Sequence, residues 1–355
     1  MIFDNYNFFI ITFFFTGLLT FLLVISKSIQ VKILKERVSG PQKIHESFIP
    51  RIGGISIYLI LFLYSLFYFE DRLLHYIVLS SSLIFFAGFF EDITNKISPN
   101  IRLISTIIAS IFCLSLVNHG IYSVGFEKID NLISGTYFPY IFSFLSIILL
   151  TQAFNIIDGL NGLCILNAVL ILLSISYVSY IHENAYLLNI SILILCSFLG
   201  VIFFNFPKPL IFIGDGGAYF TGFLLASLLI ILPEKVKVSP FFSLALVIYP
   251  VYETLRSFFR RLIIKKGSFM HPDSLHFHSL VFKYFNNKKF LKQKWIVNSF
   301  SSVISLLLPF FMTLWACLNY NDRNNLIFGI LLFLFLYEIL MYNLKKFNLN
   351  KRKVL

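Results

Sequence analysis

The sequence predicts an all-α protein that crosses a membrane about eleven times. Of its 355 residues, 58% are hydrophobic and 13% are charged, whereas an average soluble chain has roughly 25% charged residues. The mean hydropathy is +0.83. The apolar residues gather in runs of about 17–25 residues, the length that spans a bilayer. These observations exclude a soluble domain and predict one integral membrane domain over residues 1–355, with the lipid bilayer as its surroundings.

The candidate spans follow one another along the whole chain. They cover residues 8–26, 52–69, 74–90, 101–118, 138–155, 160–181, 186–205, 211–232, 239–257, 296–319 and 325–343. The boundary between the fifth and sixth spans is the shortest, because few polar residues separate two apolar runs. An odd number of spans places the two chain ends on opposite sides of the membrane.

Lys and Arg are distributed unevenly between the alternate sets of loops. One set, which includes a long basic loop over residues 256–294, carries 24 of the 29 basic residues. Because basic loops stay in the cytoplasm, the N-terminus is predicted outside and the C-terminus inside. The same loops account for the net charge of +12, so we do not expect nucleic acid as a partner.

Every unusual polar cluster falls in the loops that are predicted to be cytoplasmic. In chain order the residues are Lys43, His45, Arg51, Glu91, Asp92, Arg102, Asn155, Asp158, Gly159, Asn161, Gly214, Asp215, Gly216, Asp273, His276 and His278. A carboxylate at the end of a membrane helix is costly and marks a functional site by default. The clusters therefore predict one active site on the cytoplasmic face, made by several loops.

Separate carboxylates at one surface favour a hard divalent cation. Mg²⁺ takes oxygen ligands, usually from one or two carboxylates together with substrate phosphates. We expect Asp92, Asp158 and Asp215 to supply such a site. Glu91 and Asp92 are adjacent and point to different sides of a helix, so only one of them is expected at the cation. The glycine-rich start of the run after Gly214 favours phosphate through free N–H groups.

The histidines allow two interpretations. Asp273, His276 and His278 are acceptable zinc ligands, but the histidine spacing is not the helical i, i+4 pair and no cysteine lies nearby. The ten basic residues of the same loop favour contact with an anion. Taken together, the residues predict transfer of a phosphorylated group, with a lipid as the second substrate.

Over residues 43–278 these motifs resemble those of the polyprenyl-phosphate N-acetylhexosamine-1-phosphate transferases, in glycosyltransferase family 4 and related to phospho-MurNAc-pentapeptide translocase. The resemblance implies a Mg²⁺-dependent phosphotransferase of the bacterial plasma membrane, with Mn²⁺ as an alternative cation. It would transfer a sugar 1-phosphate from a UDP-sugar to undecaprenyl phosphate and release UMP. GlcNAc 1-phosphate is the favoured group. That reaction initiates a cell-surface glycan such as O-antigen or teichoic acid. A homodimer is compatible with it.

The resemblance also implies roles for individual residues. Asp92, preceded by Glu91, occupies the family's Asp-Asp pair, which orients or deprotonates the lipid phosphate. Asp215 matches the principal Mg²⁺ ligand, and Asn155 shares that ligation. Asp158 belongs to the same NxxDG motif, and His276 and His278 match the HxH element near the diphosphate. Contacts with the substrates fall to Lys43, His45, Arg51, Arg102, Gly159, Asn161, Gly214, Gly216 and Asp273.

Three residues depart from the family pattern, namely Glu91, Asn161 and Ala218, which stand where Asp, Asp and Ser are common. The three aspartates of the predicted cation site remain, so an active enzyme is predicted. The same reaction with a FucNAc-type or QuiNAc-type donor stays open. A polytopic transporter of lipid-linked sugars is the alternative from another class. Transporters bind their substrates near the midplane, often between repeated halves, whereas here the polar groups lie at one surface.

Overall fold

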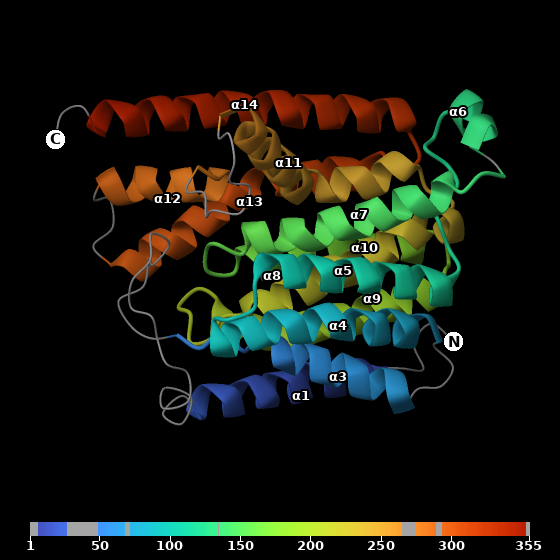
Figure 1. Ribbon diagram of the computed structural model, residues 1–355, viewed down its shortest axis with the longest axis horizontal. Coiled ribbons are helices and arrows are strands. Elements are labelled where there is room, and N and C mark those ends of the chain that lie inside the picture. Colours follow the sequence, from blue (N-terminus) through green and yellow to red (C-terminus); the bar gives the residue numbers. More distant parts are fainter. Residues whose placement is uncertain are drawn as a thin grey trace.

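The computed structural model describes residues 6–26, 49–67, 72–133, 135–264, 275–288 and 293–352. Within these segments the regular structure consists of thirteen helices and no strand (Figure 1). The helices are α1 (Tyr6–Ile25), α3 (Gly54–Phe67), α4 (Arg72–Thr94), α5 (Pro99–Val117), α6 (Glu127–Ile133), α7 (Phe138–Ile157), α8 (Leu163–Ile181), α9 (Ala185–Asn205), α10 (Gly214–Val236), α11 (Pro240–Ile264), α12 (Phe277–Lys288), α13 (Lys294–Leu318) and α14 (Arg323–Arg352). The chain is therefore an all-helical, polytopic membrane protein.

Each of the eleven predicted spans coincides with one of these helices. Among the described residues, nine helices are long and apolar enough to cross a membrane. The other two are α3, which has only 14 residues, and α11, whose second half carries Glu253 and three arginines. The uncertain boundary between the fifth and sixth predicted spans is confirmed as a tight turn between α7 and α8.

Two short helices lie where the sequence predicted loops. α6 occupies part of the outer loop, and the long basic loop over residues 256–294 holds the end of α11 and the whole of α12. The basic segment over residues 256–294 thus contains helical structure that the loop prediction, based on charge, did not include. Phe277, Leu280 and Val281 follow the i, i+3, i+4 pattern of one helix face, and all three are buried.

α10 is the centre of the bundle and contacts α3, α4, α7, α8 and α11. Its most apolar stretch is 94% buried, far more than that of any other candidate span among the described residues. Glycines let its neighbours approach closely: a Cβ on Gly222 would lie 2.7 Å from the carbonyl oxygen of Leu150 in α7, and one on Gly88 of α4 would lie 2.6 Å from the nitrogen of Gly216. Small residues at such crossings are typical of helices that pack in a membrane.

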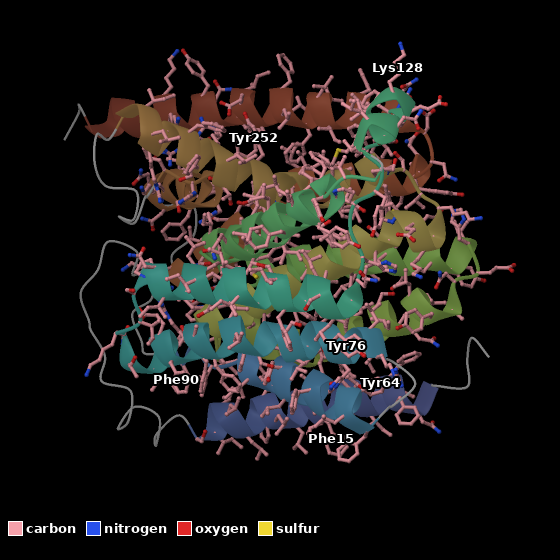
Figure 2. The ribbon with its side chains drawn as sticks, turned by 45° about the vertical axis from the view of Figure 1, so that its right-hand side comes forward. Phe15, Tyr64, Tyr76, Phe90, Lys128 and Tyr252 are labelled. Atoms are coloured by element: carbon pink, nitrogen blue, oxygen red, sulfur yellow. The ribbon has the colours of Figure 1, made fainter. Side chains whose placement is uncertain are left out.

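The outer faces of the bundle carry large apolar side chains. Phe15 on α1 and Phe90 on α4 project outward, and they are 54% and 49% exposed (Figure 2). In a soluble protein such a surface would cause aggregation, whereas in a bilayer it is covered by lipid.

Two segments far apart in the sequence meet at one end of the bundle. The N–H groups of Gly53 and Gly54 donate to the carbonyl oxygens of Phe212 (2.8 Å) and Ile213 (3.0 Å), and the N–H of Phe212 donates to Pro50 (2.8 Å). This pairing holds the start of α3 against the start of α10. The turn between α7 and α8 and helix α12 lie at the same end, on the left in Figure 1, whereas α6 lies at the opposite end.

Candidate active site

Asp215 lies in the first turn of α10, against the side chain of Arg102 near the start of α5. Nη1 of Arg102 donates to Oδ2 of Asp215 in a close ion pair. The arginine and aspartate side chains are 13% and 26% exposed, so the pair lies at the edge of the protein rather than in its interior. The structure thus brings together two predicted site residues that are 113 positions apart.

Asp92 in the last turn of α4 is held by the backbone at the start of α10. The N–H groups of Asp215 and Gly216 donate to its carboxylate, the second over 3.0 Å. Gly214 has a φ of +75°, and a Cβ there would lie 2.5 Å from Oδ2 of Asp92. Glycine is needed at position 214 for both reasons.

This glycine-rich turn was expected to offer free N–H groups to phosphate, and two of its N–H groups have a partner within the protein. The N–H of Gly216 is already bonded to Asp92, so a phosphate would have to displace that carboxylate. Contacts of Gly214 and Gly216 with a substrate therefore stay a prediction. Glu91 points elsewhere: its Oε2 accepts from the N–H of Ile97 (2.7 Å) and braces the turn before α5.

Asp158 directly follows α7, where its carboxylate faces the other site charges. Burial and the negative charge of Asp215 raise the pKa of Asp158 to about 7, while the positive charge of Arg51 opposes that shift. The turn after α7 therefore lies near the charges of Asp215 and Arg51, at the starts of α10 and α3.

We expect Asp158→Asn to raise the melting temperature at pH 8 and to change it less at pH 5. A raised carboxyl pKa means that the folded protein binds the proton more tightly than the unfolded chain does. The stability gained from the protonated form is complete below pH 3.8 and is lost as the pH rises to about 7. Asparagine removes that loss. Melting curves of the detergent-solubilised protein between pH 5 and 8 measure this, and an equal shift at all pH values would contradict it.

The two histidines of the HxH element lie at the start of α12, with parallel rings whose centroids are 5.6 Å apart. Nδ1 of His276 is 2.8 Å from Oε1 of Glu253 in α11, and since a carboxylate only accepts, that nitrogen carries the proton. Glu253 also accepts from the N–H of Phe277 (3.2 Å) and from the hydroxyl of Tyr337 in α14. Sequence analysis missed Glu253, although a carboxylate within an apolar run is itself a signal.

His278 connects α12 to the turn after α7. Its imidazole lies against Gly159, so that a Cβ on Gly159 would overlap Nε2 and lie 2.9 Å from Cδ2. Burial and the charge of His276 lower the pKa of His278 to about 3, so the ring is neutral at physiological pH. Nδ1 has no hydrogen-bond partner among the described residues. The structure thus places His278 beside the NxxDG turn, as a site residue should be.

Gly159→Ala is expected to lower activity by about 100-fold while the protein still inserts, because the added methyl group moves His278 by about 1 Å. Gly17→Ala is a matched control, since its Cβ would make only an ordinary 3.6 Å contact with Gly200. Initial rates of the purified variants measure the effect. Equal activity of the two variants would show that the contact between Gly159 and His278 has no role.

Asn161 is enclosed by other residues of the protein. Its side chain is fully buried, its N–H donates to Oδ1 of Asn298 (2.7 Å), and its Nδ2 donates to Oγ of Ser299 (3.0 Å) in α13. The contact of Asn161 with a substrate therefore stays a prediction. Asn205 also holds this turn, because its Oδ1 accepts from the N–H of Gly162 (2.9 Å).

Three predicted site residues, Lys43, His45 and Asp273, lie outside the described residues. The zinc interpretation included Asp273. Among the described residues, no three His, Cys, Asp or Glu side chains are grouped as metal ligands. Nδ1 of His276 is hydrogen-bonded to Glu253, so this nitrogen of the HxH element is not free to bind zinc.

The described donors fit Mg²⁺, which needs only one or two carboxylates and completes its shell with phosphate oxygens and water. Asp215 and Asp158 are close enough for the charge of one to raise the pKa of the other. A bound cation would relieve this effect of Asp215 on Asp158. Asn155 adds an amide oxygen, because its Nδ2 already donates to Oη of Tyr219 (3.1 Å). Asp215, Asp158 and Asn155 would therefore hold the ion.

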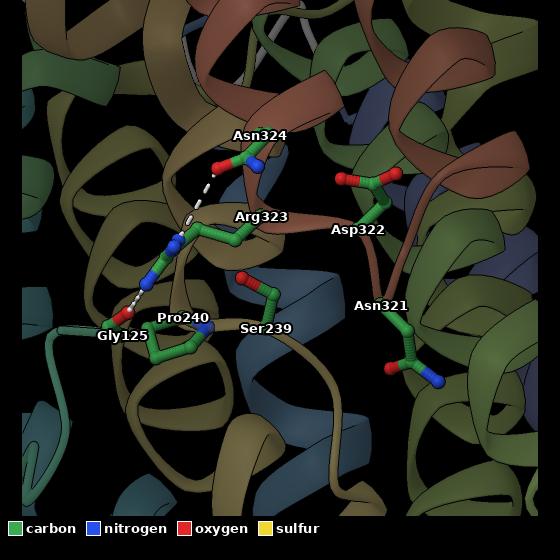
Figure 3. A pocket seen from close by; sticks show the side chains of 7 residues that line it. All are labelled: Gly125, Ser239, Pro240, Asn321, Asp322, Arg323 and Asn324. Atoms are coloured by element: carbon green, nitrogen blue, oxygen red, sulfur yellow. Dashed lines mark hydrogen bonds between the residues drawn. The ribbon is translucent and has the colours of Figure 1, made fainter. Parts of the chain in front are cut away.

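A hollow of about 640 Å³ lies at the end of the bundle away from Asp215. Figure 3 shows the residues that line it. Its two charged residues have structural partners: Nη1 of Arg323 donates to the carbonyl oxygen of Gly125 (2.8 Å), and Oδ1 of Asp322 accepts from the N–H of Asn325 at the start of α14 (3.1 Å). No predicted site residue lines this hollow, so it is not the candidate active site.

Comparison with known proteins agrees with this geometry. Residues 74–233 match the model of the family described as glycosyl transferase family 4. The chain is 28% identical to a probable undecaprenyl-phosphate N-acetylglucosaminyl 1-phosphate transferase of Bacillus subtilis, over 76% of each chain. It is 30% identical to a putative UDP-N-acetylglucosamine–dolichyl-phosphate N-acetylglucosaminephosphotransferase of Saccharolobus solfataricus, over 61% of this chain and 67% of that one.

The chain belongs to glycosyl transferase family 4. It is also 24% identical to the phospho-N-acetylmuramoyl-pentapeptide-transferase of Orientia tsutsugamushi, over 72% of this chain and 79% of the relative. The match to glycosyl transferase family 4 includes Asp92, Arg102, Asp158 and Asp215. The four residues on which the site geometry depends thus lie in the part that the family shares.

Proposed function

We propose that this chain transfers a sugar 1-phosphate from a UDP-sugar to undecaprenyl phosphate, in the plasma membrane of a bacterium. The products are a polyprenyl-diphosphate-sugar and UMP. The observation that carries the proposal is the meeting of Asp92, Asp158, Asp215 and Arg102 at one end of a membrane bundle. N-acetylglucosamine 1-phosphate is the first donor group to test, because the relatives named above act on it or on related amino sugars. The products would initiate a cell-surface glycan.

The proposed orientation follows from charge. The basic loops favour a cytoplasmic position for the end that carries the site, and UDP-sugars are found in the cytoplasm. Eleven spans, with α3 and α11 included, leave the N-terminus outside. An apolar cavity of about 370 Å³ between α7, α10 and α11 is also lined by Ile121, Pro233 and Pro240, so it opens at the other end of the bundle and is not part of the proposed site.

In the reaction, an oxygen of the lipid phosphate bonds to the β-phosphorus of the UDP-sugar, and the bond from that phosphorus to the bridging oxygen breaks. The electron pair leaves on UMP. Asp92, fixed by backbone N–H groups, orients the lipid phosphate. A phosphate monoester has a second pKa of about 6 and is mostly ionised at pH 7, so orientation matters more than proton removal. Arg102 and Arg51 bring positive charge to the diphosphate.

Mg²⁺, when bound, would neutralise charge on the diphosphate. The chain's own residues contribute the rest of the site. Glu253 fixes the tautomer and the direction of His276, and His278 remains neutral beside the turn at Gly159. A neutral His278 imidazole can donate one hydrogen bond to a sugar or phosphate oxygen without adding a charge, whereas the Nδ1 proton of His276 is already bonded to Glu253.

The proposal is tested with purified protein in detergent, undecaprenyl phosphate, Mg²⁺ and a panel of UDP-sugars, by measuring UMP release. UMP with UDP-N-acetylglucosamine supports the reaction and the sugar. UMP with only a deoxy-sugar nucleotide keeps the reaction and changes the sugar. No UMP with any donor would overturn the proposal and favour transport of a lipid-linked sugar.

A further inference from the structure

Tyr219 has contacts with two site residues, although the sequence did not single it out. It lies four residues after Asp215 on α10, so both side chains emerge on the same helix face. Its hydroxyl accepts from Nδ2 of Asn155 in α7 over 3.1 Å. The guanidinium carbon of Arg102 lies 5.9 Å from the centroid of its ring. With only 3% of its surface exposed, Tyr219 is a buried support for the outer residues.

The hydroxyl determines which atom of Asn155 is available to a cation. An asparagine amide has one oxygen and one NH₂ group, and the two exchange places when the amide turns over. Mg²⁺ accepts oxygen ligands, so only one of the two orientations is useful. Because Nδ2 donates to Tyr219, Oδ1 is the atom left for the ion. Without the hydroxyl, the amide has no partner that favours this orientation among its described contacts.

The aromatic ring of Tyr219 contacts a second site residue, Arg102. The Nε atom of Arg102 is buried and has no hydrogen-bond partner among the described residues, and the aromatic face lies beside the guanidinium group. An aromatic face attracts such a cation. Arg102 in turn pairs with Asp215. One side chain therefore supports two of the groups around the predicted cation site.

We propose that Tyr219 is a positioning residue that presents the Asn155 amide oxygen to the divalent cation and holds Arg102 beside Asp215. This inference rests on the proposed function for its substrates, but its test also measures metal binding directly. A positioning partner of a metal ligand commonly contributes about 10–100-fold in metal affinity or activity.

The test compares Tyr219→Phe with Tyr58→Phe. Each change removes one hydroxyl, because Tyr58 is also buried and its hydroxyl lies 2.8 Å from Oγ of Ser82. Mn²⁺ binding is measured by electron paramagnetic resonance, and UMP release is measured over a range of Mg²⁺ concentrations. Tyr219→Phe is expected to weaken Mn²⁺ binding by about 10-fold and to raise the Mg²⁺ requirement equally. Tyr58→Phe should change neither.

Asn155→Asp separates positioning from general stability. A carboxylate has two equivalent oxygens and presents one in either orientation. In the Asn155→Asp background, Tyr219→Phe should therefore leave Mn²⁺ affinity unchanged. A loss of the same size in both backgrounds would overturn the inference, as would unchanged affinity in Tyr219→Phe alone. If the wild type binds Mn²⁺ but releases no UMP, the proposed function fails while the inference on the amide is still decided by the binding data.

Discussion

Asp215→Asn is expected to reduce Mg²⁺-dependent UMP release by at least about 100-fold. Asp215 pairs with Arg102, and its charge raises the pKa of Asp158, so it lies at the centre of the charged groups. Asparagine keeps the size of the side chain and one oxygen but removes the negative charge that attracts the cation. The rate should remain low even at high Mg²⁺ concentration, because the ion that does bind lacks its main anionic ligand.

A matched control is Asp322→Asn at the opposite end of the bundle. Asp322 caps α14 by accepting from the N–H of Asn325 (3.1 Å), and asparagine caps helices equally well. This variant should keep wild-type activity and stability. Wild-type activity in Asp215→Asn, with an unchanged Mg²⁺ requirement, would show that the cation is held elsewhere. The amount of monodisperse protein in detergent distinguishes lost chemistry from lost folding.

The helices were predictable because a bilayer imposes a length on each span. Runs of about 20 apolar residues become helices that satisfy their own backbone, and all eleven predicted runs do so. The common position of the polar clusters was predictable too, because loop charge assigns every second loop to one side. Asp92, Asp215 and Arg102 therefore lie together, as expected.

The contacts between those clusters could not be predicted from local sequence. Nothing near Gly216 indicates that its N–H is used by Asp92, 124 residues earlier in the chain, nor that Asn161 is buried against Asn298. Such bonds depend on which helices are neighbours, and apolar runs of similar composition do not encode their partners. For the same reason, the sequence does not reveal that Gly216 and Asn161, which are predicted substrate contacts, also have partners within the protein.

The sequence contains a signal for two residues, Tyr219 and Glu253, that were not predicted to act at the site. Tyr219 follows Asp215 by four residues, a spacing that places both on one helix face. Glu253 interrupts an apolar run, and a carboxylate in such a run is functional by default. Glu253 lies in no glycine-rich or polar cluster, and Tyr219 follows the glycine-rich turn as one aromatic residue among many in an apolar run. Their importance comes from the side chains that they hold in place.

Glu253→Gln is expected to lower activity by about 10–100-fold, the effect of removing the partner that orients a site histidine. Glu253 is 1% exposed and accepts from His276, from the N–H of Phe277 and from Tyr337. Three donors converge on this carboxylate, whereas glutamine has only one oxygen and adds an NH₂ group among them. One of the three donors must then face the NH₂ group of the glutamine. We expect α12 to move away from the turn at Gly159 as a result. UMP release by the purified variant measures this effect.

Glu338→Gln is the matched control, because Glu338 accepts from Arg256 (2.6 Å) and Tyr252 (2.9 Å) rather than from either histidine. It is next to Tyr337 in α14, so it tests whether any lost carboxylate on this helix disturbs the site. Its activity should stay within about 2-fold of wild type, since 46% of its side chain is exposed. The double variant Glu253→Gln/His276→Ala should be no less active than His276→Ala, because the carboxylate acts through that ring. Additive losses would show instead that Glu253 supports the bundle independently of His276.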